Sequence, residues 1–317
     1  MNEKLPKTLI EAVKYFADEQ TCIDFVASLR WEDGKPLCLH CRSENVGFLA
    51  TRKIWKCKNK ECRKQFSIKT GTIFEDSALK LEKWLVAIWL IANAKNGISS
   101  YELHRSLGIT QKSAWFVLHR IRLAMSQGSV DKLSGDVEAD ETYIGGHPKN
   151  MHQKRRKSIG KYGSKLGLYE HKTPVIGVLE RKGKVRARVV ERTRLEQVIP
   201  FIDENVEKES YLFTDQARIY MQMHKNYIHY TVNHAVEYVR GRAHTNSIEN
   251  FWSLLKRTIK GTYVSIQAEH LQKYVEEQCF RYNNRETNDQ GRFMELIKSI
   301  GGKRMTYKKL IGYQTAH

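Results

Sequence analysis

Residues 136–146 read Asp-Val-Glu-Ala-Asp-Glu-Thr-Tyr-Ile-Gly-Gly, and this stretch decides the fold of the C-terminal half. Its side-chain pattern predicts a β-strand from Asp136 to Ile144 that ends at the two glycines. Successive side chains of a strand point to opposite faces, so Asp140 and Glu141 are expected to face opposite ways. A site on one face of this strand therefore receives only one of these two neighbouring acids.

Two acids further along the chain stand in comparable settings. Asp215 follows the strand-like run Tyr211–Thr214, and Glu249 lies in the amphipathic segment Asn246–Ile259, which predicts a helix. Further elements are predicted between the first strand and the helix that carries Glu249. They are strands over 174–179, 185–190 and 228–232 and helices over 195–206 and 216–224.

The order of these elements is strand, strand, strand, helix, strand, helix, strand and helix. It is typical of a ribonuclease-H-like α/β core, a mixed sheet with helices on both faces. The first and fourth strands of such a sheet are neighbours, so Asp140 and Asp215 are expected to meet. The late helix is expected to bring Glu249 across to them. Three carboxylates placed in this way suit two divalent cations about 4 Å apart, which promote phosphoryl transfer.

Lys256 follows Glu249 by seven residues, which is two turns along the same helical face. We expect its ammonium group to contact a phosphate beside the scissile bond. A surface lysine without such a contact is the alternative. For each acid alone, a solvated or capping carboxylate would be the better interpretation, and only their order and setting favour catalysis.

Four cysteines form a metal-binding pattern in the N-terminal part. Cys38 and Cys41 make one close pair, and Cys57 and Cys62 make a second pair after fifteen intervening residues. Two such thiolate pairs on tight turns can complete a tetrahedral site for one structural Zn²⁺. Short apolar stretches between the pairs predict the strands of a zinc ribbon. Four buried thiols without a metal are the alternative.

A helix-turn-helix is predicted after the ribbon. A buried helix over 79–95 precedes Ser99, which can cap a short helix to Leu107, and a glycine-bearing turn leads into a second helix over 111–125. The second helix of such a motif reads DNA through its N-terminal residues. The residues expected to do so here are Gln111, Lys112 and Ser113. An ordinary helical hairpin inside a bundle is the alternative.

The charge of the chain favours a nucleic-acid partner. The 317 residues include 54 Lys and Arg against 35 Asp and Glu, a formal net charge of +19. An excess of this size indicates a polyanionic partner more often than a basic protein without one. Cations cluster in residues 149–172, where we expect a phosphate-binding loop, with a merely solvated loop as the alternative. The cations expected to contact DNA are Arg155, Arg156 and Lys157 in this loop, and Arg257 and Lys260 on the late helix.

The longest apolar run, Leu85–Ala92, is far shorter than the roughly 20 residues of a membrane-spanning helix. No signal-peptide pattern follows Met1, so we expect a cytoplasmic protein with no membrane partner. The predicted domains are an N-terminal helical segment 1–30, a zinc ribbon 31–72, a helix-turn-helix domain 75–128, a ribonuclease-H-like catalytic domain 133–285 and a basic C-terminal tail 286–317.

These motifs together resemble the DDE transposases of bacterial insertion sequences, in particular the group with an N-terminal zinc ribbon and an ISXO-like catalytic domain. Four sequence blocks carry the resemblance: Asp140–Gly146, Thr214-Asp215, Ile248–Arg257 and Phe280–Arg285. The resemblance implies Mg²⁺ or Mn²⁺ as cofactor, with two ions held by Asp140, Asp215 and Glu249. It also implies DNA cleavage followed by strand transfer.

The resemblance further implies that the DNA partners are the terminal inverted repeats of an element and a target DNA, joined by a homodimer or higher assembly. Some relatives have another residue as the third ligand, so Asn246 and Asn250 are rivals to Glu249. Two alternative functions stay open at this point. One is a ribonuclease-H-like nuclease or resolvase that cleaves without joining, and the other is a zinc-ribbon DNA-binding regulator with a vestigial catalytic domain.

Overall fold

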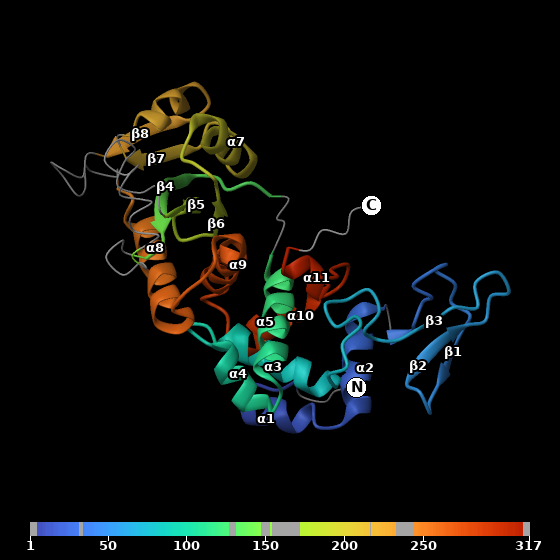
Figure 1. The fold of residues 1–317 in the computed structure, drawn as a ribbon. Coiled ribbons are helices and arrows are strands. Elements are labelled where there is room, and N and C mark those ends of the chain that lie inside the picture. Colours follow the sequence, from blue (N-terminus) through green and yellow to red (C-terminus); the bar gives the residue numbers. More distant parts are fainter. Residues whose placement is uncertain are drawn as a thin grey trace. The chain divides into compact units, whose positions relative to one another are not determined.

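The computed structural model describes residues 5–31, 34–126, 131–146, 153, 172–215, 217–232 and 244–312. The chain divides into two compact units. Unit 1 comprises Met1–Gln127 and Asn284–His317, and unit 2 comprises Gly128–Asn283. Figure 1 shows the helices and strands of both units.

Unit 1 combines a small antiparallel sheet with several helices. The sheet order is β1-β2-β3, with Trp55 of β2 opposite Phe48 of β1 and Phe66 of β3. Its strands are β1 (Val46–Leu49), β2 (Ile54–Cys57) and β3 (Gln65–Phe66). Its helices are α1 (Leu9–Tyr15), α2 (Glu19–Arg30), α3 (Leu81–Asn93), α4 (Ser100–Leu107), α5 (Gln111–Met125), α10 (Asp289–Lys298) and α11 (Tyr307–Leu310).

Local sequence signals set the boundaries of α4 and α5. The Ser99 side chain accepts a hydrogen bond from the Glu102 N–H at the start of α4, as the capping pattern predicts. Gly108 ends α4 in the left-handed region, with φ +58°. The Thr110 side chain accepts from the Ser113 N–H and so begins α5. The two short helices and the turn between them therefore lie at the residues that the sequence indicates, and their role as a DNA-reading helix-turn-helix stays a prediction.

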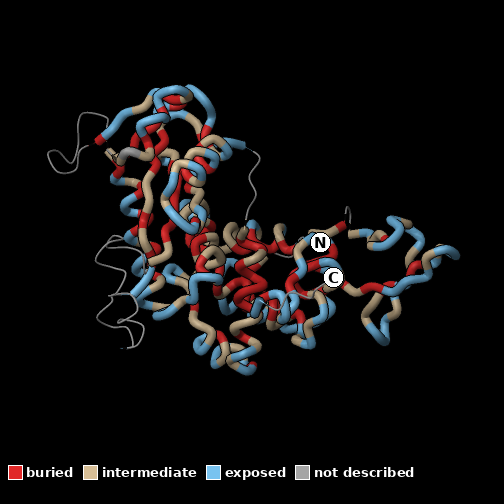
Figure 2. Tube along the Cα trace, turned by 45° about the horizontal axis from the view of Figure 1, so that its top comes forward, coloured by how far each residue is buried: buried red, intermediate tan, exposed pale blue. Residues whose placement is uncertain are grey.

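Helix α5 is buried along most of its length and keeps exposure mainly at its N-terminal end. Its residues from Val117 to Met125 are all buried except Leu123, and Figure 2 shows buried and exposed positions along the chain. The buried residues of α5 include charged ones such as Arg120. The guanidinium of Arg120 lies over Trp84 and donates to the Glu75 carbonyl. Apart from Leu123, only residues in the first two turns of α5 keep partial exposure, so α5 is a central packing helix of unit 1.

The sequence predicts only a basic tail over 286–317, and the described part of this segment forms two helices, α10 and α11. Residues 289–298 form α10, which packs against α3. Phe293 of α10 is almost fully buried and has ring contacts with Phe16, Phe25 and Trp89. Burial of a large aromatic side chain against three others stabilises the attachment of this segment to unit 1.

Unit 2 is built on a mixed five-stranded sheet with the order β6-β5-β4-β7-β8. The pairs β4–β5 and β5–β6 are antiparallel, and the pairs β4–β7 and β7–β8 are parallel. The strands are β4 (Asp136–Ile144), β5 (Thr173–Glu180), β6 (Val185–Val189), β7 (Tyr211–Asp215) and β8 (Ile228–Val232). The prediction that the first and fourth strands of this half are neighbours is confirmed by the pairing of β4 with β7.

The apolar core of unit 2 consists of two clusters. Neighbouring residues of β5 belong to different clusters, so the two clusters lie on opposite faces of the sheet. Ile176 and Val178 pack with α7 (Leu195–Asn205) and with the 3-10 helix η3 (Arg218–Lys225). Val175 and Leu179 pack with α8 (Asn246–Thr258) and α9 (Ala268–Asn283). The helices therefore cover both faces, as the sequence predicts.

Helix α9 also satisfies the edge strand β6. The Asn283 side chain accepts from the Val185 N–H at 2.7 Å and donates to the Val185 carbonyl at 3.1 Å. Gln272 accepts from the Val189 N–H at 2.7 Å. Side chains of one helix thus take the hydrogen bonds that an open sheet edge would offer to another strand.

Candidate active site and zinc site

The pairing of β4 with β7 places Asp140 beside Asp215. The last paired residues of these parallel strands are Glu138 and Phe213, and each aspartate stands two positions further along its strand. Residues two apart on a strand share a face, so both aspartates belong to the face of the sheet that carries Glu138 and Phe213. The expected meeting of the two strand acids is therefore supported by the sheet register.

Asp140 contacts helix α8 and lies near two other carboxylates. The indole N–H of Trp252 on α8 donates to Oδ2 of Asp140 at 3.1 Å. Burial, together with the charges of Glu141 and Asp215, raises the pKa of Asp140 from its ordinary value of 3.8 to about 7. Burial and like charge both disfavour the ionised form, so the site favours a cation that would neutralise it.

Gly177 on β5 makes room for this arrangement. It pairs directly with Asp140 across the two strands. A Cβ atom on Gly177 would come within 2.7 Å of the Trp252 ring, which is closer than real contacts allow. The absence of a side chain at this position lets the indole lie close to the sheet and reach the carboxylate.

Glu141 lies on the other face of the sheet, but its charge interacts with those of Asp140 and Asp215. Its Oε2 accepts a hydrogen bond at 2.6 Å from the hydroxyl of Tyr220, a buried residue of η3. The expected opposite orientation of Asp140 and Glu141 is confirmed, since their partners come from helices on opposite faces. Burial raises the pKa of Glu141, and the Asp215 charge adds to the rise. No sequence motif gives Glu141 a role, and its position beside Asp140 is the one signal that points to it.

Asp215 is held by the turn that follows β7. Its Oδ1 accepts from the Ala217 N–H at 3.0 Å, a local side-chain-to-backbone bond that fixes the carboxylate. The preceding Thr214 is fully buried, and its hydroxyl lies 2.8 Å from Nε2 of His229 on β8. The end of β7 is therefore held by two hydrogen bonds, one between Asp215 and the following turn and one between Thr214 and β8.

Helix α8 carries Glu249 and Lys256 on either side of Trp252. The pKa of Lys256 is lowered by burial, and the charge of Asp140 opposes this effect, so the two groups interact electrostatically. Glu249 is exposed, and its Oε1 accepts from the Thr245 hydroxyl at 3.0 Å. Among the described residues, Asp140, Asp215 and Glu249 do not form a cluster tight enough for a metal. The role of Glu249 as third ligand stays a prediction.

The four cysteines of unit 1 form such a cluster. Their sulfur atoms all lie within 4.8 Å of one another, with Cys38 3.7 Å from Cys62 and Cys41 3.6 Å from Cys57. Burial opposes ionisation of Cys38, but the N–H groups of Cys41 and His40 lower its pKa to about 7. Four thiols whose sulfur atoms lie this close together match the donor set of a structural zinc site.

The residues expected to read DNA on α5 all have partners within unit 1. The Gln111 side chain donates to the Ser100 hydroxyl at 2.9 Å, and Nζ of Lys112 lies 4.8 Å from the ring centre of Tyr307 on α11. Ser113 accepts from the Thr110 hydroxyl at 2.8 Å. These contacts position the first turn of α5, and a DNA contact there stays a prediction.

The remaining cations predicted to contact DNA divide into two groups. Arg257 and Lys260 are exposed at the C-terminal end of α8 and just after it. Arg155, Arg156 and Lys157 lie outside the described residues. None of the helices in the described part of the chain is both long and apolar enough to span a bilayer.

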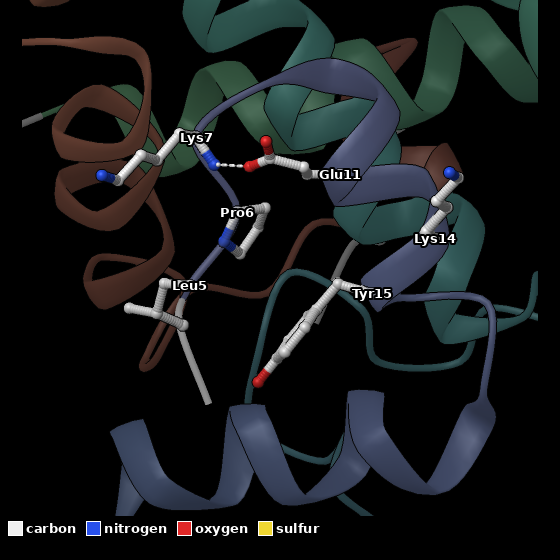
Figure 3. Close-up of a pocket in the computed structure, with 6 residues that line it drawn as sticks. All are labelled: Leu5, Pro6, Lys7, Glu11, Lys14 and Tyr15. Atoms are coloured by element: carbon white, nitrogen blue, oxygen red, sulfur yellow. Dashed lines mark hydrogen bonds between the residues drawn. The ribbon is translucent and has the colours of Figure 1, made fainter. Parts of the chain in front are cut away.

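A pocket at the start of α1 offers no comparable chemistry. Figure 3 shows its lining residues, which are Leu5, Pro6, Lys7, Glu11, Lys14 and Tyr15. Its carboxylate, from Glu11, accepts a hydrogen bond from the Lys7 N–H at 2.7 Å. This one acid, already engaged, does not make a metal site.

Two segments of the chain match models of known protein families. Residues 132–283 match the model of the ISXO2-like transposase domain, and residues 17–65 match that of the transposase zinc-ribbon domain. A protein in transposable element ISH50 of Halobacterium salinarum is 28% identical over 254 residues, covering 77% of this chain and 84% of that protein. A transposase-like protein of Haemophilus influenzae is 31% identical over 120 residues, covering 38% of this chain and 94% of that protein. The chain belongs to the family of insertion-sequence transposases that combine a zinc ribbon with an ISXO2-like domain.

Proposed function

We propose that this transposase binds the ends of an insertion sequence and catalyses metal-dependent DNA cleavage and strand transfer. The parallel pairing of β4 with β7, which aligns Asp140 with Asp215 on one face, is the observation that carries the proposal. In the sheet of unit 2, β4 lies between β5 and β7, and this strand order also supports a ribonuclease-H-like fold.

The proposed catalytic residues are Asp140, Asp215, Glu249 and Lys256. The two aspartates would hold Mg²⁺ or Mn²⁺, and Glu249 would complete a two-ion site from the start of α8. Such ions, when bound, supply charge neutralisation and activation of the attacking hydroxyl. Lys256 lies close enough to Asp140 for their charges to interact, so its ammonium group would bind a phosphate oxygen beside the carboxylates.

DNA binding is assigned to several surfaces outside the carboxylate site. The zinc ribbon would present its strands to the element end, with one Zn²⁺ cross-linking Cys38, Cys41, Cys57 and Cys62. The first turn of α5 would contribute Gln111, Lys112 and Ser113, as a helix-turn-helix does. Arg257 and Lys260 would extend the phosphate contacts along α8 and beyond its end. Because two element ends must be brought together, the active form is proposed to be a homodimer or a larger assembly.

Purified protein incubated with Mg²⁺, labelled element ends and a target plasmid tests this proposal. A joined product is expected, and Asp140→Asn, Asp215→Asn and Glu249→Gln are each expected to abolish cleavage while retaining end binding. Cleavage without joining would indicate a nuclease or resolvase, and binding alone would indicate a regulator. If one of these variants cuts at the wild-type rate, the role of that residue is refuted.

A further inference from the structure

The carboxylate of Glu138 is fully buried on β4, two residues before Asp140. Its Oε1 lies 2.8 Å from Nε of Arg181 and 3.3 Å from Nδ1 of His244. Its Oε2 accepts a hydrogen bond at 2.9 Å from the Ile248 N–H. A carboxylate withdrawn from water in this way is tolerated only where both oxygens have partners, and here they do.

The bond to Ile248 acts as a helix cap supplied from a distant strand. Ile248 is the third residue of α8, and the N–H groups of a first turn have no partner inside their helix. Thr245, the residue before the helix, makes no side-chain capping bond, because its hydroxyl donates to Glu249 instead. Glu138 takes that place and adds a negative charge at the positive end of the helix dipole.

Arg181 connects this cap to the other strand of the site. Its Nη2 donates to the His244 carbonyl at 2.7 Å, just before α8. Its guanidinium carbon lies 4.0 Å from the ring centre of Phe213, two residues before Asp215. Arg181 and Glu138 together thus contact the three elements that carry Asp140, Asp215 and Glu249.

We propose that Glu138 is a positioning residue that sets where α8 begins relative to β4, and thereby places Glu249 opposite Asp140. This inference rests on the proposed function. Both carboxylate oxygens of Glu138 are engaged in the interior, so it serves the site through the Ile248 N–H and not as a metal ligand. For this role, a side chain long enough to reach the Ile248 N–H matters more than the negative charge of Glu138.

Two conservative variants separate reach from charge. Glu138→Gln keeps the side-chain length and an acceptor oxygen for Ile248 but loses the charge beside Arg181. Glu138→Asp keeps the charge but is one methylene shorter, so it cannot hold both partners. If Glu138 positions α8, Glu138→Gln retains most of the cleavage rate. Glu138→Asp loses about 100-fold in kcat, the effect of a displacement of about 1 Å in an active site, with little change in KM for DNA.

Hydrogen exchange provides a readout that needs no catalysis. The Ile248 amide should exchange about tenfold faster or more in Glu138→Asp than in wild type, as expected when a hydrogen bond worth about 1.4 kcal/mol is lost. The same amide should stay protected in Glu138→Gln. The amide of Leu255, inside α8, should be unchanged in both variants and serves as the control.

The outcomes distinguish the possible failures. Activity and Ile248 protection that are kept in Glu138→Asp and lost in Glu138→Gln would assign Glu138 to charge pairing and overturn the proposal. Loss of protection without loss of kcat would also overturn it. If wild-type protein does not cut DNA, the proposed function fails, while the exchange measurement still decides whether Glu138 caps α8. If Glu138→Gln does not fold, Glu138→Gln with Arg181→Met removes the buried cation, and the same protection of Ile248 is expected.

Discussion

Replacing Asp140 by Asn should stabilise the Mg²⁺-free protein, and the gain should depend on pH. The pKa of Asp140 is raised from 3.8 to about 7, a difference of about 3 units. At about 1.4 kcal/mol per unit, the ionised carboxylate costs unit 2 up to about 4 kcal/mol of unfolding free energy. The amide of Asn carries no charge and can still accept the hydrogen bond from the Trp252 indole, so the variant avoids this cost.

The direction of the pH effect follows from proton binding. Between pH 4 and pH 7 the folded protein holds a proton on Asp140 that the unfolded chain has released, so wild-type stability falls as the pH rises. The amide that replaces this carboxyl in Asp140→Asn cannot titrate. The stability difference between Asp140→Asn and wild type should therefore be small near pH 4 and reach its full size above pH 7.

The stability difference between Asp140→Asn and wild type can be measured by urea unfolding with pulsed hydrogen exchange, followed on peptides from β4. The measurement is made at pH 4 and at pH 8, in buffer without Mg²⁺ and with the zinc retained. Glu204→Gln is the matched control, because Glu204 forms an exposed ion pair with Arg188 and such pairs contribute about 0–1 kcal/mol. Added Mg²⁺ should stabilise wild type at pH 8 but not Asp140→Asn. Equal gains at both pH values, or equal Mg²⁺ effects on both proteins, would refute this account of the site.

Three further predictions concern the helix, the sheet and the ribbon. Glu249→Gln should lose cleavage with end binding intact, whereas Asn250→Ala, its neighbour on α8, should cut like wild type in the same gel assay. Gly177→Ala should push the Trp252 ring away from the sheet and lower the unfolding free energy by about 1–3 kcal/mol, measured by urea denaturation, with a loss of cleavage. Cys57→Ser should reduce bound zinc, measured by atomic absorption, and weaken end binding because the ribbon loses metal-derived folding energy. Retained zinc and full binding in this variant would argue against a four-thiolate site.

The sheet of unit 2 was predictable because its information is local and repeated. The alternation around Asp140 and the apolar runs before Asp215 each specify a strand, and the order of elements then restricts which strands pair. The capping residues Ser99 and Thr110 likewise specify helix starts from their own side chains. These predictions require no knowledge of distant contacts.

The features that sequence reasoning missed depend on distant contacts. The charged residues Arg120 and Arg122 make α5 resemble a surface helix, yet both are buried. The Arg120 guanidinium is accommodated between aromatic rings from two different helices, which no local pattern reveals. The ring contacts of Phe293 with Phe16 and Phe25 likewise join residues far apart in the sequence, so no local pattern predicts them. Burial of isolated charged or aromatic residues is a tertiary property, and the sequence shows it only after the fold is known.

The position of Trp252 also bears on which residue of α8 completes the site. Its contact with Asp140 shows which side of the helix faces the carboxylates. At about 100° per residue, Glu249 lies about 60° around the helix from Trp252 and Lys256 about 40°, on the same side. Asn246 lies about 120° away and Asn250 about 160° away, which turns both amides from Asp140. The helix register therefore favours Glu249 over either asparagine as third ligand, since one side of α8 then presents a carboxylate, an indole donor and an ammonium group in successive turns.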